Sequence, residues 1–146
     1  MQSSLMLDVQ GLWLTADERV ILRQPEVCGV ILFARNVDNP KQVAELCRSI
    51  RAVRSDLLIS VDQEGGRVRR LRRGFAPLPS MRSVAATSDA VKTAQLAGWL
   101  MAADVMSVGI DFSFAPVLDL DYGRNEVIAD RSCGQKAEQF VELGRA

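Results

Sequence analysis

Two short apolar segments with a helical pattern between them constrain the fold of this chain more than any other feature. Residues 29–33 (Gly-Val-Ile-Leu-Phe) and 57–61 (Leu-Leu-Ile-Ser-Val) are almost continuously apolar. Strands with this character are typical of a parallel sheet, because helices cover both faces of such a sheet. Apolar residues recur at helical spacing over residues 43–53, between the two segments. The sequence therefore predicts a β-α-β unit.

The same alternation of strand and helix patterns continues on both sides of this unit. We expect strands and helices in turn at residues 5–9, 15–24, 29–33, 39–53, 57–61, 89–108, 110–118 and from about 135 onward. Thr15 and Glu18 form a capping box for the first helix, and Asn39 caps the second with Pro40 at its first position. The polar, proline-containing residues 67–80 are too many for a tight turn, and loops of that length are often functional.

Strand–helix repetition of this kind fits two architectures, an open doubly wound sheet or an eight-stranded barrel cut short. The first strand is not followed by a Gly-x-Gly-x-x-Gly motif and no Walker loop is present, which argues against a nucleotide-binding sheet. A complete barrel needs about 250 residues. We therefore predict an α/β fold of the (β/α)8 TIM-barrel type, truncated to about its first four β-α units. Residues 1–146 would be the N-terminal part of one barrel domain.

Charge and hydropathy argue against several classes of partner. The chain has 18 basic and 18 acidic residues, a balance that indicates neither nucleic acid nor an anionic membrane. It has no apolar stretch of about 18 residues that would span a bilayer. Residues 1–4 lack the basic start of a secretion signal. Cys28, Cys47 and Cys133 match no metal or disulfide pattern, so we expect free thiols and a cytoplasmic protein.

Histidine is absent from the chain. This removes the commonest general base near neutral pH and the commonest zinc ligand. Any chemistry must therefore use carboxylates, arginines, lysines or backbone groups, unless a catalytic residue is missing from these 146 residues.

The best candidate site directly follows the strand at residues 57–61, where the sequence reads Asp-Gln-Glu-Gly-Gly-Arg over residues 62–67. Ligands bind at the carboxyl ends of parallel strands, because loops converge there on a rigid frame. Asp62 can accept hydrogen bonds from a polyhydroxylated substrate, or it can cap the turn or pair with an arginine. Glu64 is expected to accept amide hydrogens within the turn.

A run of arginines follows the turn, comprising Arg67, Arg69, Arg70, Arg72 and Arg73. One or two of them can act as forked donors to a sugar hydroxyl, carboxylate or phosphate. A nucleic-acid site would need a wider basic surface or interleaved aromatic residues, and neither is visible. We expect most of these arginines to be solvated.

Two other features have weaker functional signals. Asp119 and Asp121 resemble the Asp-x-Asp of metal-dependent transferases, but further oxygen ligands cannot be located, so we predict no metal site and expect them to shape the strand end. Trp99 lies in the predicted inner side of the helix at residues 89–108, and Trp13 precedes a capping box. We expect both to be packing residues. The inner side is predicted to comprise Val91, Ala94, Leu96, Trp99, Ala102, Ala103 and Met106.

Four stretches of the chain carry a resemblance to a known family. They are residues 29–36 (GVILFARN), 61–71 (VDQEGGRVRRL), 114–119 (FAPVLD) and 127–132 (VIADRS). In order and spacing, they resemble family-three glycoside hydrolases of the β-N-acetylhexosaminidase branch. The likeness is strongest to the cytoplasmic bacterial type that removes N-acetylglucosamine from peptidoglycan fragments during cell-wall recycling.

The resemblance implies a (β/α) barrel, a retaining mechanism through a covalent glycosyl–enzyme intermediate, and no metal or organic cofactor. It matches Asp62 to the carboxylate that holds sugar hydroxyls, and Arg70 and Arg131 to arginines of the same subsite. The family's Lys-His pair, histidine acid/base and aspartate nucleophile have no counterpart here. The resemblance thus implies no catalytic residue in this chain, which would be the first half of such an enzyme.

A half-barrel would have two unpaired sheet edges and an uncovered inner face. We therefore expect the chain alone to self-associate through those edges or to aggregate, and not to hydrolyse glycosides. Two other functions stay open. The chain can be a non-catalytic half-barrel that binds sugar through Asp62, Arg70 and Arg131, or it can bind nucleic acid or an acidic partner through residues 67–73.

Overall fold

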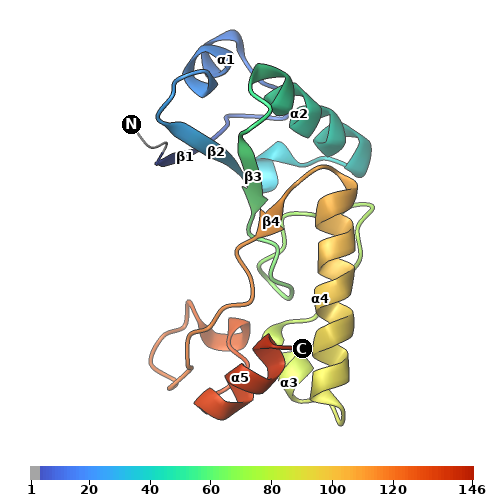
Figure 1. Cartoon of the computed structure of the whole chain (residues 1–146). Coiled ribbons are helices and arrows are strands. Elements are labelled where there is room, and N and C mark those ends of the chain that lie inside the picture. Colours follow the sequence, from blue (N-terminus) through green and yellow to red (C-terminus); the bar gives the residue numbers. More distant parts are fainter. Residues whose placement is uncertain (1–3) are drawn as a thin grey trace.

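A parallel sheet organises the N-terminal part of the fold in the computed structural model, which describes residues 4–146 (Figure 1). Its strands are β1 (Leu5–Asp8), β2 (Val27–Leu32), β3 (Leu58–Val61) and β4 (Phe112–Ser113). All neighbours pair in parallel, in the order β1-β2-β3-β4. Sequential parallel neighbours characterise a barrel, whereas a doubly wound sheet reverses its strand order at a switch point. Residues 1–3, on which the expected lack of a secretion signal partly depends, lie outside the described residues.

Helices alternate with the strands, mostly where the sequence predicts them. They are α1 (Ala16–Leu22), η1 (Ala34–Asn36), α2 (Pro40–Val53), α3 (Met81–Ala85), α4 (Ala90–Ser107), η2 (Ala129–Arg131) and α5 (Ala137–Gly144). The capping box is confirmed, since the Thr15 hydroxyl accepts from the Glu18 amide at 3.2 Å and the Glu18 carboxylate accepts from the Thr15 amide at 2.7 Å. No helix within residues 4–146 is both long and apolar enough to cross a bilayer.

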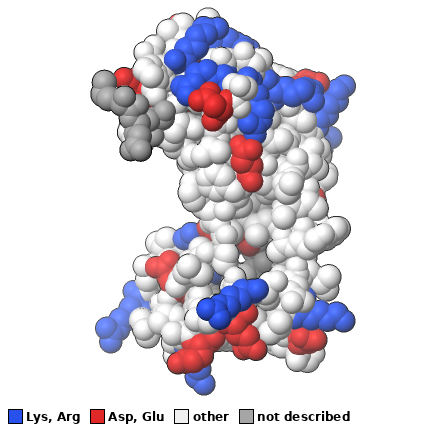
Figure 2. All heavy atoms as spheres, in the orientation of Figure 1, with Lys and Arg blue, Asp and Glu red and all other residues white. Residues whose placement is uncertain are grey.

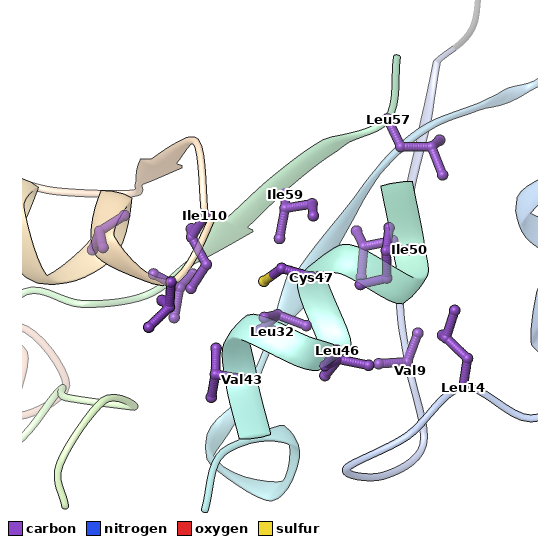
Figure 3. Packing of buried hydrophobic residues seen from close by; sticks show 14 of the residues in the cluster. Val9, Leu14, Leu32, Val43, Leu46, Cys47, Ile50, Leu57, Ile59 and Ile110 are labelled. Atoms are coloured by element: carbon purple, nitrogen blue, oxygen red, sulfur yellow. The ribbon is translucent and has the colours of Figure 1, made fainter. Parts of the chain in front are cut away.

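The main core lies between the sheet and α2 (Figure 3). Leu32 and Ile59 from the strands and Leu46 and Ile50 from α2 are fully buried there. The opposite face of the sheet is less covered, and Leu58 is 47% exposed on it. This asymmetry means that the helices stabilise the sheet from one side.

A second, smaller packing unit forms around the C-terminal helices. Cys133, Phe140 and Leu143 are its buried residues, and Met81 and Val91 pack against them. Figure 1 shows α3 and α5 beside the end of α4 that lies away from the sheet. Figure 2 shows charged side chains at both ends of the face in view, with a largely uncharged band between them.

The predicted strand at residues 110–118 is wrong in its length, because β4 comprises only Phe112–Ser113. Its partner β3 ends at Val61, so the register stops at the pair of Val61 with Ser113. One further amide, that of Phe114, reaches the Val61 carbonyl at 3.0 Å. Pro116 then lacks an amide hydrogen, so the chain leaves the ladder.

The predicted inner side of α4 is mostly wrong, because Leu96, Trp99, Ala102, Ala103 and Met106 are exposed. Leu96, Trp99 and Met106 are 61%, 70% and 69% exposed, so Trp99 is not a packing residue, nor is Trp13 at 54%. Apolar residues occur on most sides of α4, so helical periodicity alone does not identify its buried face. Neighbouring elements decide it instead, and Val105 is the buried residue within the helix.

Candidate functional site

The turn after β3 is shaped by two glycines in left-handed conformations. Gly65 has φ 113° and Gly66 has φ 54°. The chain folds back so that the Val68 carbonyl accepts from the Glu64 and Gly65 amides at 2.9 and 3.2 Å. A β-carbon at Gly65 would lie 2.0 Å from the Pro79 carbonyl oxygen, which excludes any side chain there. The turn therefore holds its shape through backbone conformations that favour glycine.

The side chain of Gln63 holds the chain segment that follows this turn in place. Its side chain is fully buried. The Gln63 Oε1 atom accepts from the Arg70 and Leu71 amides at 2.9 and 3.0 Å, and Nε2 donates to the Leu71 carbonyl at 3.1 Å. These bonds bring Arg70 beside Asp62, although Gln63 itself contacts neither side chain through these bonds.

Asp62 and Arg70 form a partly exposed ion pair at the turn. Arg70 Nη2 lies 3.4 Å from Asp62 Oδ2, and the side chains are 24% and 26% exposed for Arg70 and Asp62. The pairing with an arginine that the sequence left as one alternative for Asp62 is thus observed. Arg70 Nε is buried and has no hydrogen-bond partner among residues 4–146. The pair therefore retains both an unused donor and a partly exposed carboxylate.

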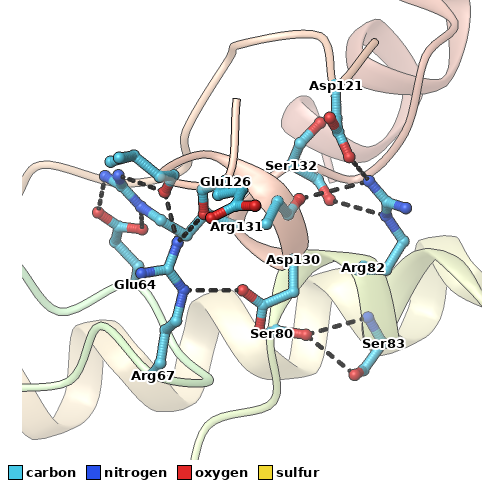
Figure 4. Close-up of polar contacts among 12 residues, drawn as sticks. Glu64, Arg67, Ser80, Arg82, Ser83, Asp121, Glu126, Asp130, Arg131 and Ser132 are labelled. Carbon is cyan, nitrogen blue, oxygen red and sulfur yellow. Dashed lines mark hydrogen bonds and ion pairs between the residues drawn. The ribbon is translucent and has the colours of Figure 1, made fainter. Parts of the chain in front are cut away.

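Arg131 approaches the same turn from η2, far along the chain, but its partner is Glu64 (Figure 4). Its Nε and Nη2 atoms donate to the two Glu64 oxygens at 2.8 and 2.7 Å. The hydrogen bond from Arg131 to Glu64 raises the pKa of Arg131, burial opposes this, and the negative charges of Asp62 and Asp119 raise it further. Arg131 is thus held at the turn by Glu64.

These observations place the three predicted site residues around one turn. Asp62 contacts Arg70 directly, whereas Arg131 makes its ion pair with Glu64. The expectation that the Glu64 side chain accepts amides within the turn is wrong, since its oxygens bond to a guanidinium. A cavity of about 130 Å³ is lined by Glu64 and by mostly apolar residues. Asp62, Arg70 and Arg131 are not among its lining residues.

The other arginines of the run divide between contacts and solvent. Arg67 Nε bonds to Asp130 at 3.0 Å, and its Nη2 donates to the Glu126 and Val127 carbonyls. Arg72 and Arg73 are exposed, in line with the expected solvation of much of the run.

Asp121 shapes the loop beyond β4, whereas the sequence assigned Asp119 and Asp121 to the strand end, which lies at Ser113. Asp121 accepts from the Gly123 amide at 2.8 Å and from Arg82 Nη2 at 2.7 Å. These two hydrogen bonds lower the pKa of Asp121 below its ordinary value. Within residues 4–146, no three potential metal ligands of the His, Cys, Asp or Glu type lie together.

Comparison with known proteins assigns the family. Residues 5–146 match the glycosyl hydrolase family 3 N terminal domain. The chain belongs to glycosyl hydrolase family 3. Its resemblance to this family, first seen in the four sequence stretches, is confirmed.

Relatives within family 3 agree on this assignment. The β-hexosaminidase of Pseudomonas aeruginosa is 60% identical over 146 residues, covering 100% of this chain and 44% of the relative. That of Tolumonas auensis is 51% identical over 97% of this chain and 43% of the relative. The chain therefore spans less than half the length of these curated relatives.

A solved structure confirms the fold. NagZ from Neisseria gonorrhoeae, in complex with N-trifluoroacetyl-D-glucosamine, is 38% identical with a TM-score of 0.91. The match covers 95% of this chain and 43% of that one. The predicted TIM-barrel-like α/β fold is confirmed by this likeness together with the four parallel strands.

Proposed function

We propose that this chain supplies part of the sugar-binding site of a β-N-acetylhexosaminidase, a retaining glycosidase that removes terminal β-linked N-acetylglucosamine. The observation that carries the proposal is the pairing of Asp62 with Arg70 at the carboxyl end of β3. Support comes from the names of the relatives and from the NagZ neighbour, which was solved with an N-acylated glucosamine.

The chemistry of the turn suits a sugar. A hydroxyl group both donates and accepts, so it can donate to the Asp62 carboxylate while it accepts from the adjacent guanidinium. The Arg70 side chain is 24% exposed and directs Nη2 toward Asp62, so a hydroxyl or acetamido oxygen of the ligand can accept from the same guanidinium. Arg131 adds a second guanidinium to the same turn through its ion pair with Glu64. Together, the three residues offer donors and acceptors to neighbouring oxygens of one ring.

The catalytic groups themselves are proposed to lie outside these 146 residues. In the family that the chain resembles, the aspartate nucleophile and the histidine acid/base come later in the sequence, and neither has a counterpart here. We therefore expect the chain alone to bind sugar without hydrolysing it. The proposed substrates of the whole enzyme are N-acetylglucosamine-containing muropeptides from cell-wall recycling in the cytoplasm, as the resemblance implies.

Equilibrium binding of N-acetylglucosamine, followed by ligand-observed NMR, tests the sugar site. Asp62→Ala is expected to abolish binding, because it removes the hydroxyl acceptor and leaves Arg70 without its partner. Asp56→Ala is the matched control, since Asp56 is an exposed carboxylate before the other end of β3. Equal binding by wild type and Asp62→Ala would contradict the proposal.

Turnover of a chromogenic N-acetylglucosaminide tests the catalytic part. We expect no turnover by the chain alone. Hydrolysis that persists in repeatedly purified protein would show that the catalytic groups lie within these residues, and would overturn that part of the proposal.

A further inference from the structure

The Glu64 carboxylate is almost completely enclosed by the protein, with 6% of its side chain exposed. Its two oxygens accept from Arg131 Nε and Nη2 at 2.8 and 2.7 Å, the side-by-side geometry of a bidentate pair. Such a pair fixes the plane of a guanidinium as well as its position. One ion pair thus determines how Arg131 is oriented.

Successive side chains of residues 62–64 have different partners. Asp62 pairs with Arg70, Gln63 binds backbone groups inside the turn, and Glu64 holds Arg131. Glu64 is therefore a poorer candidate than Asp62 for a sugar ligand, because only 6% of its side chain is exposed. A buried ion pair is also weak evidence for stability, since desolvation offsets much of the attraction.

The bidentate pair leaves a defined edge of Arg131 unused. A guanidinium has five N–H donors, of which Glu64 takes one on Nε and one on Nη2. Nη1 has a long contact of 3.3 Å with the Val127 carbonyl. These three bonds use three of the five N–H groups, so one hydrogen on Nη1 and one on Nη2 remain for a ligand.

We propose that Glu64 is a positioning residue, which aims the free Nη edge of Arg131 at the sugar. This inference rests on the proposed sugar subsite of Asp62, Arg70 and Arg131. It assigns Glu64 no contact with the substrate.

The segment that carries Arg131 depends on contacts with the turn to keep its conformation. Ala129 has φ 39°, a left-handed conformation that a β-carbon disfavours. A second ion pair joins the same two segments, because Arg67 contacts Asp130 at 3.0 Å. This second pair is much more exposed, at 48% and 44%. Mutation of Arg67 therefore weakens the link between the two segments without changing the ion pair that orients Arg131.

The experiment compares Glu64→Gln and Glu64→Asp with the control Arg67→Gln in the full chain. Gln keeps the length of the side chain without its charge, whereas Asp keeps the charge but shortens the reach. N-acetylglucosamine affinity and the hydrogen exchange of the Arg131 Nε–H, observed by ¹⁵N NMR, are measured with the melting temperature. We expect both Glu64 variants to bind about tenfold more weakly or worse and to lose Nε–H protection. Arg67→Gln should keep both.

The outcomes separate this inference from the sugar-binding proposal. One contrary result is that Glu64→Gln loses protection of the Arg131 Nε–H and still binds N-acetylglucosamine with wild-type affinity. That result would overturn the positioning role of Glu64 and leave the sugar-binding proposal intact. If wild type binds no N-acetylglucosamine, the proposed function fails. Nε–H exchange then tests alone whether Glu64 orients Arg131. Equal exchange in wild type, Arg67→Gln and Glu64→Gln then overturns the inference, whereas loss in Glu64→Gln alone supports it. If Glu64→Gln does not fold, Glu64→Asp carries the same comparison.

Discussion

At the scale of single residues, Gln63 shows how a side chain without chemistry of its own determines a site. It is fully buried and satisfies three backbone groups of Arg70 and Leu71. Its role is not evident from the sequence, because an amide between two carboxylates has no distinctive signal. Its position, directly after an apolar strand and before paired glycines, is the only hint that its side chain turns inward.

Replacement of Gln63 by leucine should destabilise the chain strongly. The change leaves two amides and one carbonyl buried without partners, and each unpaired group costs about 1–3 kcal/mol. We expect a loss of about 3 kcal/mol or more in the free energy of unfolding, measured by urea denaturation. Gln95→Leu, on the exposed side of α4, is the control. A loss for Gln63→Leu no larger than for Gln95→Leu would contradict this account.

The thiols offer a second prediction at this scale. Burial raises the pKa of Cys47 to about 12, so almost no thiolate is present at pH 8. Burial also raises the pKa of Cys133 above its ordinary value, whereas Cys28 is partly exposed. A thiol reagent at pH 8 should therefore modify Cys28 first, with the site identified by mass spectrometry. Modification of Cys47 before unfolding would refute this expectation.

At the scale of elements, the caps were the most predictable parts of the fold. Thr15 with Glu18, and Asn39 with Pro40, act over a few residues, so local sequence suffices to place α1 and α2. Strand length and helix facing depend on partners elsewhere. This is why β4 was predicted too long and why Trp99 was placed on the wrong side of α4.

The capping box gives α1 a pH dependence. Burial alone would raise the pKa of Glu18, but hydrogen bonds from the Thr15 and Gln10 amides and from the Thr15 hydroxyl lower it below 4.5. A carboxyl with a lowered folded-state pKa stabilises the protein above its unfolded value, and this contribution is lost as pH falls through the folded value. Stability should therefore decline below about pH 4.5.

Glu18→Gln tests this directly by urea denaturation across pH 2–7. It should lower stability by about 1 kcal/mol at pH 7, the usual size of a lost cap, and flatten the decline in acid. Asp17→Asn, on the exposed neighbour, serves as the control. If the free energy of unfolding of Glu18→Gln fell in acid as steeply as that of wild type, Glu18 would not be the source of the pH dependence.

At the scale of the whole molecule, the sheet is covered unevenly. The core lies on the α2 side, while Leu58 on the other face and Phe114 just beyond β4 are each 47% exposed. The sequence predicted the alternation of strands and helices and the location of Asp62, because both follow from local patterns. It did not predict the pairing of Glu64 with Arg131, which joins residues 67 positions apart.

This uneven coverage predicts self-association of the isolated chain. Exposed apolar side chains and unpaired strand edges favour contact between copies. Analytical ultracentrifugation should show oligomers whose fraction rises with concentration. Leu58→Lys on the sheet face should reduce this fraction, while Leu96→Lys on exposed α4 should not. A stable monomer at all concentrations would contradict the prediction.

The three differently directed side chains of residues 62–64 also limit how this loop can change over evolutionary time. In an extended segment, the loss or gain of one residue turns every later side chain to the opposite side. Deletion of one residue here would turn the Glu64 carboxylate, the partner of Arg131, inward and the Gln63 amide outward. Substitutions elsewhere can accumulate one at a time. An insertion or deletion in residues 62–64 would instead change which side chain contacts which partner.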